Sequence, residues 1–195
     1  MSKIGCVMLA GGLATRMGGG DKGFKNIGGR PIIERILETV RHQVDDIVIN
    51  ANGDPARFAN LNLDVVADSV DGFVGPLAGI LAGMDRFSVE YDWMLSVPTD
   101  TPFLPDDLVE KLFVPLKNNQ AEIAIAHSGG FDHPVIGIWP TRLKDDLRAA
   151  LVEEDIRKLK KWISRYRYQA VSWPDTPRDP FFNANRPEDL NIDLF

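Results

Sequence analysis

The sequence predicts a doubly wound α/β fold, in which helices pack on both faces of a parallel β-sheet. Four short apolar runs in the first hundred residues each end at glycine, asparagine, aspartate or proline, as strands buried on both faces do. Helical patterns lie between these runs, and parallel strands need crossover connections of that kind. Because right-handed crossovers align the carboxyl ends of the strands, we expect ligands to bind along that edge of the sheet.

The first half of the chain supplies these elements in order. Apolar residues recur at helical spacing through residues 30–44, where Pro31 suits the first helical turn, and the same period continues in residues 76–87. The expected strands are 3–10 (KIGCVMLA), 45–51 (DDIVINA), 63–68 (LDVVAD) and 92–98 (DWMLSVP).

The second half is less regular. Its apolar spacing predicts helices at 105–119 and 142–166, two strands joined by a glycine-rich loop in 121–140, and a further strand at 168–173. A proline-rich loop then leads to a short terminal helix at Pro187. No repeat or linker interrupts the chain, so we expect one domain over residues 1–195, with the part beyond about residue 120 elaborating the same sheet.

Composition limits the classes of function. The net charge of the 195 residues is -6, which argues against a nucleic-acid partner, although residues 157–167 hold six basic and no acidic residues and can capture an anion locally. The first apolar run is too short to span a membrane and lacks a cleavage site for export. Cys6 is the only cysteine, so an internal disulfide is impossible and a packed, inert thiol in a reducing cytoplasm is expected.

A glycine-rich stretch, LAGGLATRMGGGDKG at 9–23, follows the first expected strand. Glycines let backbone N–H groups approach a ligand closely, and phosphate oxygens are their natural partners, with Arg16 and Lys22 supplying charge. The alternative is a surface loop with solvated charges. Spacing from the strand argues against a dinucleotide fingerprint, and Gly23 stands where a P-loop needs Ser or Thr.

These residues resemble the first motif of nucleotidyltransferases, which attach a nucleoside monophosphate to a phosphate-bearing acceptor. In particular, the chain resembles the molybdenum cofactor guanylyltransferases, the molybdopterin-guanine dinucleotide biosynthesis protein A family. Gly11 stands where cytidylyltransferase relatives typically carry alanine, which favours GTP over CTP. The resemblance implies a three-layer Rossmann-like nucleotidyltransferase fold with a mostly parallel central sheet. Its further motifs are INAN (49–52), ADS (67–69), GPLAG (75–79), PTDTPF (98–103), DHP (132–134) and FFNANRPEDL (181–190).

The resemblance also implies which residues bind the nucleotide. Backbone groups, an amide and a carboxylate together can distinguish guanine by its N–H donors and its carbonyl acceptor. Asp100 is expected to ligate Mg²⁺, which takes one or two carboxylates plus phosphates and waters; the alternative is an aspartate that caps a turn. Arg16, Lys22 and Asp100 are the expected catalytic residues, and the nucleotide-binding set is Leu9, Ala10, Gly11, Gly12, Lys22, Asn50, Asp68 and Asp100.

The acceptor is expected to bind in residues 121–195, opposite a nucleotide-binding half in 1–120. His133 either donates to a phosphate or pterin atom or is a hydrogen-bonded loop histidine. Asn183 and Asn185 alternate along an extended segment and so face the acceptor together, or else cap the terminal helix. Arg157 and Lys158 either bind the anionic acceptor or lie on a solvated helix face. His42 and His127 show no ligand spacing and receive no role.

The implied reaction is attack by the terminal phosphate of molybdopterin, or of a bis-molybdopterin molybdenum cofactor, on the α-phosphorus of GTP. An ionised phosphate already carries a nucleophilic oxygen, so no general base is needed. Molybdenum-insertion proteins and molybdoenzyme chaperones are candidate partners, to which a labile pterin product would pass directly. Two alternatives stay open: a nucleotidyltransferase of this fold that uses CTP or a sugar-phosphate acceptor, and a GTP-binding adaptor that delivers the cofactor.

Overall fold

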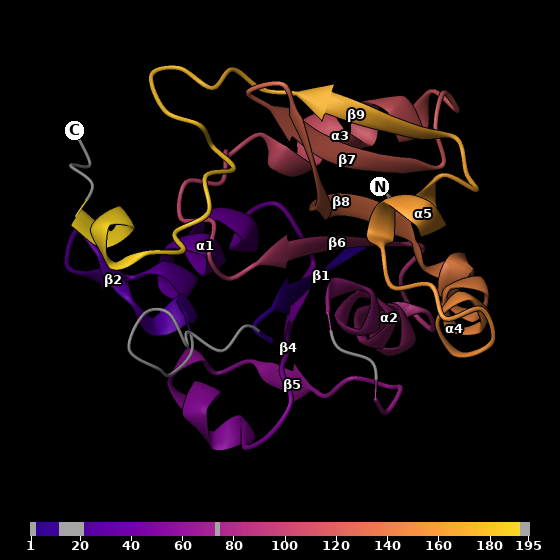
Figure 1. Ribbon diagram of the computed structural model, residues 1–195, viewed down its shortest axis with the longest axis horizontal. Coiled ribbons are helices and arrows are strands. Elements are labelled where there is room, and N and C mark those ends of the chain that lie inside the picture. Colours follow the sequence, from indigo (N-terminus) through magenta and orange to yellow (C-terminus); the bar gives the residue numbers. More distant parts are fainter. Residues whose placement is uncertain (1–2, 12–21, 73–74, 192–195) are drawn as a thin grey trace.

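A seven-stranded β-sheet carries the fold in the computed structural model, which describes residues 3–11, 22–72 and 75–191 (Figure 1). The strand order is β5-β4-β1-β6-β8-β7-β9, and only β8 among these seven runs antiparallel to its neighbours. The mostly parallel sheet confirms the expected fold class. The strands are β1 (Ile4–Leu9), β4 (Asp46–Asn50), β5 (Asp64–Val66), β6 (Trp93–Pro98), β7 (Ile123–Ser128), β8 (Phe131–Pro140) and β9 (Tyr168–Ser172).

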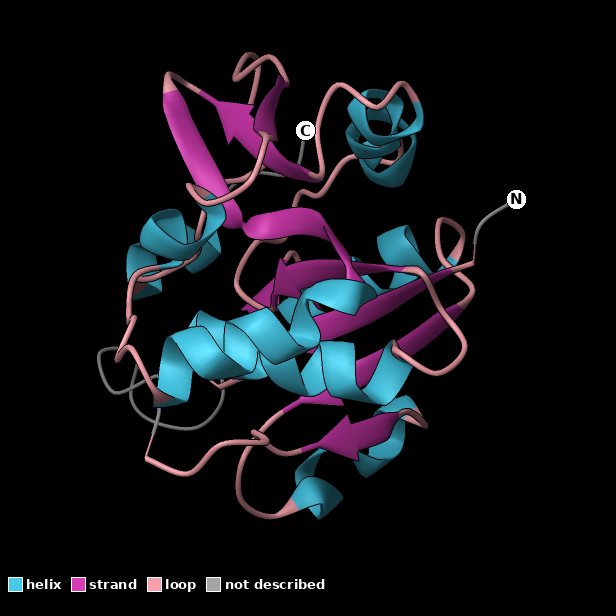
Figure 2. Cartoon of the chain, turned by 90° about the vertical axis from the view of Figure 1, so that its right-hand side faces the viewer, coloured by secondary structure: helices cyan, strands magenta, loops and turns pink. Residues whose placement is uncertain are grey.

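Helices cover both faces of the sheet, and Figure 2 shows helices packed in front of its strands. Alternate residues of β1 divide the core, because Cys6 and Met8 belong to one buried cluster and Val7 to the other. Within the described residues, no helix is long and apolar enough to cross a bilayer. The first cluster includes α1 (Ile32–Arg41) and α3 (Leu108–Lys117); the second includes α2 (Pro76–Phe87), α4 (Lys144–Val152) and α5 (Leu159–Ile163).

The thiol of Cys6 is fully buried in the first cluster, as expected, and burial raises its pKa far above the usual value for a cysteine. Because the thiolate is the reactive form, this cysteine packs as a small apolar side chain.

The helix expected over 142–166 is wrong as a single element, because the chain breaks between α4 and α5. Asp155 has a φ of 50°, a left-handed conformation that a continuing α-helix does not allow. The break lets Ile156 turn inward, where it is 2% exposed. The terminal helix expected at Pro187 is present as a short 3-10 helix, η5 (Pro187–Asn191).

A small hairpin after the glycine-rich stretch, β2 (Asn26–Ile27) and β3 (Arg30–Pro31), was not expected from the sequence. Gly28 and Gly29 form its two-residue loop with φ values of 56° and 77°, which suit glycine. The short 3-10 helix η2 (Lys22–Phe24) packs so closely beside the sheet that a Cβ on Gly23 would lie 3.1 Å from Thr99 Cβ. Lys22 is thereby held next to the loop after β6.

Candidate active site

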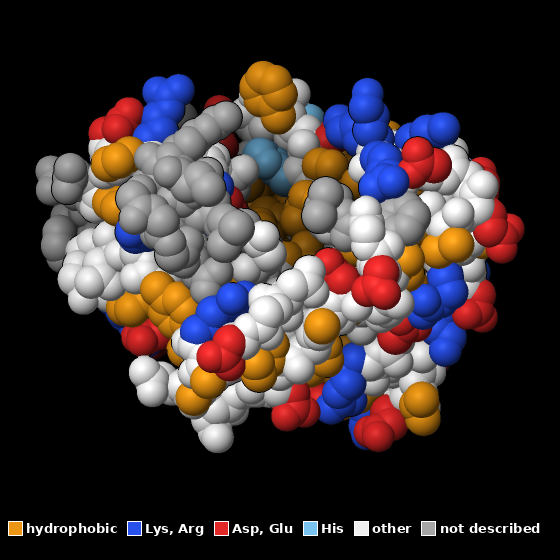
Figure 3. Space-filling model, turned by 60° about the horizontal axis from the view of Figure 1, so that its bottom comes forward, with side chains coloured by type: hydrophobic (Ala, Val, Ile, Leu, Met, Phe, Trp, Pro, Cys, Tyr) orange, Lys and Arg blue, Asp and Glu red, His pale blue; other side chains and the backbone are white. Residues whose placement is uncertain are grey.

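A cavity of about 490 Å³ opens at the carboxyl ends of β4, β1 and β6, and Figure 3 shows a hollow on this side of the molecule. These strand ends meet at one edge, as the sequence predicted from the positions of Leu9, Asn50, Asp68 and Asp100. The cavity is lined by Leu9, Gly11, Lys22, Asn50, Asn52, Asp68, Gly75, Pro76, Pro98, Thr99, Asp100, Asp132, His133, Pro134, Val135, Ile136 and Asn183.

One end of the cavity carries two asparagines and a carboxylate. Asn50, 4% exposed at the end of β4, donates from Nδ2 to Asp68 Oδ1 at 2.9 Å and to the Val66 carbonyl at 3.3 Å. Asn52 donates to Asp68 Oδ2 at 2.8 Å and accepts from the Asp68 backbone N–H at 2.9 Å. Both carboxylate oxygens are therefore held in place, with lone pairs left for donors on a ligand.

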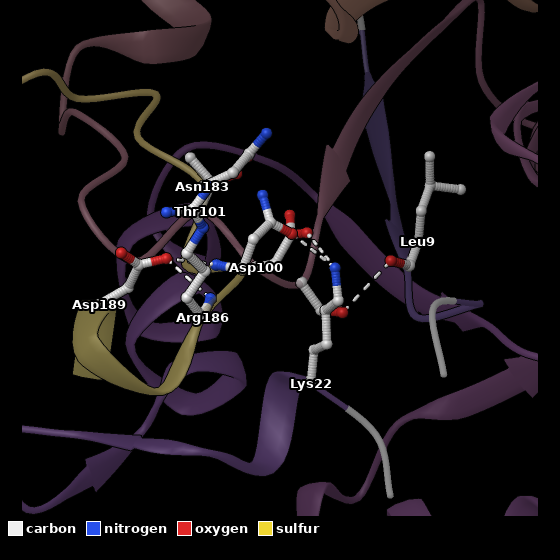
Figure 4. Close-up of polar contacts among 9 residues, drawn as sticks. Leu9, Lys22, Asp100, Thr101, Asn183, Arg186 and Asp189 are labelled. Atoms are coloured by element: carbon white, nitrogen blue, oxygen red, sulfur yellow. Dashed lines mark hydrogen bonds and ion pairs between the residues drawn. The ribbon is translucent and has the colours of Figure 1, made fainter. Parts of the chain in front are cut away.

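The middle of the cavity holds a cation beside a carboxylate. Lys22 Nζ donates to Asn185 Oδ1 at 2.6 Å and lies 3.5 Å from Asp100 Oδ2, with the two charged side chains 23% and 20% exposed. Figure 4 shows Asp100 between Leu9 on β1 and Asn183 near the C-terminus. Burial raises the pKa of the Asp100 carboxyl more than the ammonium of Lys22 lowers it. A phosphate bound at this point would contact the ammonium of Lys22 and would take the place of the water that burial removes from it.

The C-terminal segment reaches the cavity through its own hydrogen bonds (Figure 4). The Ala184 N–H donates to the Asp100 carbonyl at 2.8 Å, and Thr101 Oγ1 donates to Asn183 Oδ1 at 3.0 Å. The carboxylate of Asp189 receives the backbone N–H groups of residues 185 and 186, each at 2.8 Å. The side chains of Asn183 and Asn185 therefore bond to Thr101 and Lys22, and the alternative that they cap the terminal helix is wrong.

A bulge in β8 brings the other end of the cavity into reach. The pairing of His133 with Ala126 is followed directly by that of Gly137 with Ile125, so residues 134–136 have no partner on β7 and line the cavity instead. His133 lies on this strand and not in a loop, and its Nε2 is 2.8 Å from Ser128 Oγ. Its neighbour Asp132 accepts hydrogen bonds from Lys160 and His127, each at 2.9 Å, and these lower the Asp132 pKa.

The remaining expected site residues lie elsewhere. Ala10 is 3% exposed, and its N–H donates to the Asn50 carbonyl at 2.9 Å, so it joins two strands. Arg157 and Lys158 are exposed in the break between α4 and α5 and do not line the cavity; Arg157 pairs with Asp155 at 2.5 Å. Their role toward an acceptor stays a prediction, as do the roles of Gly12 and Arg16, which lie outside the described residues.

Four residues of the site were missed from the sequence. Asn52 stands two residues after Asn50 in INAN, and Asp132 precedes His133 in DHP, so the motifs contained both. Ser128 bonds both to His133 and to Asp179, and Ser128 and Asp179 come from segments 51 residues apart. No local pattern could have indicated that contact.

Comparison with known proteins shows the family of this chain. Residues 6–171 match the family model described as the MobA-like NTP transferase domain. A molybdenum cofactor guanylyltransferase of Rhodopseudomonas palustris (strain BisB5) is 54% identical over 94% of this chain and 89% of its own, and one of Nitrobacter hamburgensis is 53% identical over 94% and 90%.

Solved structures show the same fold. The molybdopterin-guanine dinucleotide biosynthesis protein A of Archaeoglobus fulgidus has a TM-score of 0.74 at 23% identity, with 95% of this chain and 94% of that chain covered. A 4-diphosphocytidyl-2C-methyl-D-erythritol synthase of Anaerococcus prevotii has a TM-score of 0.75 at 13% identity, with 97% and 93% covered. The sequence matches to the curated relatives and to the family model go further than the fold: this chain belongs to the molybdenum cofactor guanylyltransferase family of MobA-like NTP transferases.

Proposed function

We propose that the protein transfers GMP from GTP to the terminal phosphate of molybdopterin, forming molybdopterin guanine dinucleotide and releasing pyrophosphate. An oxygen of the acceptor phosphate forms a bond to the α-phosphorus of GTP, while the bond from that phosphorus to the bridging oxygen of the pyrophosphate breaks. The observation that carries the proposal is the order of groups along one sheet edge. Asn50 and Asp68 lie at one end, Lys22 and Asp100 in the middle, and His133 at the other.

This order suits two anionic substrates that meet in line. The carboxylate of Asp68, which Asn50 and Asn52 hold in place, matches the N–H donors of guanine. Lys22 then lies where the phosphates pass, and its ammonium offsets their charge while the chain holds the reacting atoms in position. The acceptor approaches from the second half of the chain, residues 121–195, and the nucleotide from the first, residues 1–120.

A magnesium ion fits Asp100. The carboxylate is mostly buried at the cavity wall, and no cluster of three or more His, Cys, Asp or Glu side chains suited to a metal occurs in the described ranges. A single protein carboxylate is a sufficient donor set for Mg²⁺, which takes its other ligands from phosphates and water. When bound, the ion would neutralise charge on the triphosphate. Asp100 would hold it, and Lys22 would keep its place on the phosphate oxygens.

Release of pyrophosphate tests this function. We expect the purified protein to release pyrophosphate from GTP only when both molybdopterin and magnesium are present. Molybdopterin is the acceptor that reacts with GTP, and magnesium neutralises charge on the triphosphate. With CTP at the same concentration the rate should fall by at least tenfold, since cytosine lacks the paired N–H donors that face Asp68 in this arrangement. The product should carry guanine, as judged by mass spectrometry after release of the nucleotide.

The same assay separates the alternatives. Turnover with CTP at or above the rate with GTP would identify a cytidylyltransferase. Binding of GTP with no pyrophosphate release under any acceptor would identify a delivery adaptor and contradict the proposal. A pterin product that is easily oxidised suits direct handover to molybdenum-insertion proteins or molybdoenzyme chaperones in the cytoplasm, where we propose that the protein acts.

A further inference from the structure

A buried serine joins a histidine to an aspartate at the acceptor end of the cavity. Ser128 is 1% exposed at the end of β7. Its Oγ lies 2.8 Å from His133 Nε2 and donates to Asp179 Oδ1 at 2.6 Å. The Phe181 ring packs on the imidazole with 5.1 Å between centroids, so the orientation of the histidine is held from two sides.

The protons of this trio can be assigned by counting donors. A serine hydroxyl has one hydrogen, and an ionised carboxylate can only accept. The hydrogen of Ser128 therefore points at Asp179, and the serine oxygen must accept from His133 Nε2–H. A neutral imidazole carries one hydrogen, so His133 Nδ1 is left with a free lone pair. In the part of the chain that the structure describes, Ser128 is the residue that bonds to the imidazole, through its hydroxyl at Nε2 and through its backbone.

Burial favours the neutral ring. It lowers the pKa of His133, although the carboxylate of Asp179, a backbone hydrogen bond of Ser128 and the carboxylate of Asp132 oppose that effect; His127 acts in the same direction as burial. At neutral pH the imidazole therefore carries one acceptor nitrogen, on a residue that lines the cavity. An ionised phosphate offers only acceptor oxygens, and two acceptors cannot bond to each other.

We propose that His133 is a specificity-determining residue that accepts a hydrogen bond at Nδ1 from a ring N–H or amino group of the acceptor's fused heterocycle, and that Ser128 and Asp179 are positioning residues that fix its tautomer. This inference rests on the proposed function, in which the acceptor occupies the β8 end. It replaces the expectation that His133 donates to a phosphate or pterin atom.

The guanine base is the other N–H donor in the reaction, but the sheet separates it from His133. Asp68 follows β5 and His133 lies on β8, four strand spacings away in the order β5-β4-β1-β6-β8. At about 4.8 Å per spacing the two ends are roughly 19 Å apart, more than one heterocycle can bridge. His133 therefore recognises the acceptor and not the nucleotide.

Nitrogen NMR of the ligand-free protein tests the tautomer without any assay of function. The chain has only three histidines, so ¹⁵N-histidine labelling gives a simple spectrum. We expect His133 to show a protonated Nε2 and an unprotonated Nδ1 at pH 7.5. His127 is the internal reference with the opposite tautomer, because its Nδ1 donates to Asp132 Oδ1. His133→Gln assigns the resonances. A protonated Nδ1 on His133 would overturn the inference.

Kinetics of paired variants test the recognition. His133→Gln can keep a donor toward Ser128 but has no acceptor at the Nδ1 position, whereas His133→Asn places an amide oxygen there. We expect the glutamine variant to raise KM for the acceptor about 10- to 100-fold with KM for GTP unchanged, and the asparagine variant to recover most of that loss. An equal effect of both variants, or a rise in KM for GTP, would contradict the assignment.

The positioning residues give a third readout. Asp179→Asn lets the serine hydroxyl turn toward Nε2, so the His133 resonances should shift toward a mixture of tautomers and KM for the acceptor should rise several-fold. Ser128→Ala should shift the His133 tautomers and raise KM for the acceptor in the same way. Ser128→Thr, which keeps the hydroxyl, should show the wild-type tautomer and the wild-type KM for the acceptor. Kinetic effects with an unchanged tautomer would overturn the roles of Ser128 and Asp179. If pyrophosphate release is absent in the wild type, the proposed function fails, while the NMR result still decides the tautomer.

Discussion

Replacing Asp100 with asparagine is expected to lower kcat about 10²- to 10³-fold while the protein stays folded. The amide has the same size as the carboxylate, and the contact that joins this loop to the C-terminal segment runs through the Asp100 backbone carbonyl, so the local structure survives. Among the described residues, Asp100 is the one carboxylate at the middle of the cavity lining, and the loss of one preorganised charge at a reacting phosphate has an effect of that size.

Steady-state pyrophosphate release, with circular dichroism to monitor folding, measures this effect. Asp106→Asn is the matched control, because that carboxylate is exposed and lies outside the cavity, so its kcat should equal the wild-type value. If Asp100→Asn turns over within a few-fold of the wild type across a magnesium titration, Asp100 does not hold the metal.

Replacing Gly79 with alanine is expected to displace the residues at the nucleotide end of the site, against which Gly79 packs. A Cβ on Gly79 in α2 would lie 2.3 Å from Asn50 Oδ1 and 2.7 Å from Leu9 Cδ2, distances that force the helix and the strand ends apart. Asn50 would then lose its alignment with Asp68. We expect KM for GTP to rise at least tenfold, in addition to a loss of about 1–3 kcal/mol in the free energy of unfolding from overpacking.

Gly83→Ala separates the two effects. Its Cβ would lie 2.6 Å from Met94 Sδ and 2.7 Å from Val7 Cβ, in the core and one helical turn after Gly79, the residue that packs against Asn50. Urea unfolding should show a similar loss of stability for both variants, whereas KM for GTP should change only for Gly79→Ala. Equal KM values in the two variants would mean that Asn50 does not position the nucleotide.

The fold could be predicted from the sequence because its signal is local. Apolar runs such as 45–51 and the helical period of 30–44 appear in the printed sequence, and parallel strands constrain where their ends meet. The helix break at Asp155 could not be predicted from the sequence. The apolar period continues through this residue, and its positive φ depends on the packing of Ile156. The hairpin at Gly28 and Gly29 has a local pattern, NIGGRP, whose two adjacent glycines are typical of a two-residue hairpin loop.

The site was predictable where residues follow strand ends and not where they meet across the fold. Asn50, Asp68 and Asp100 each lie at or just after the end of a strand, and their convergence follows from topology. The contacts of Lys22 with Asn185 and of Ser128 with Asp179 join residues 163 and 51 positions apart. Such pairs depend on how the C-terminal segment packs against the sheet edge, which spacing alone does not determine.

The most direct test of the central claim is a crystal structure of the protein with magnesium and a GTP analogue whose α–β bridge cannot be cleaved. We predict guanine against Asn50 and Asp68, phosphates against Gly11 and Lys22, and the metal on Asp100, with the α-phosphorus open toward the His133 end of the cavity. A nucleotide bound away from Gly11 and Lys22, or with its base at the His133 end, would contradict the account.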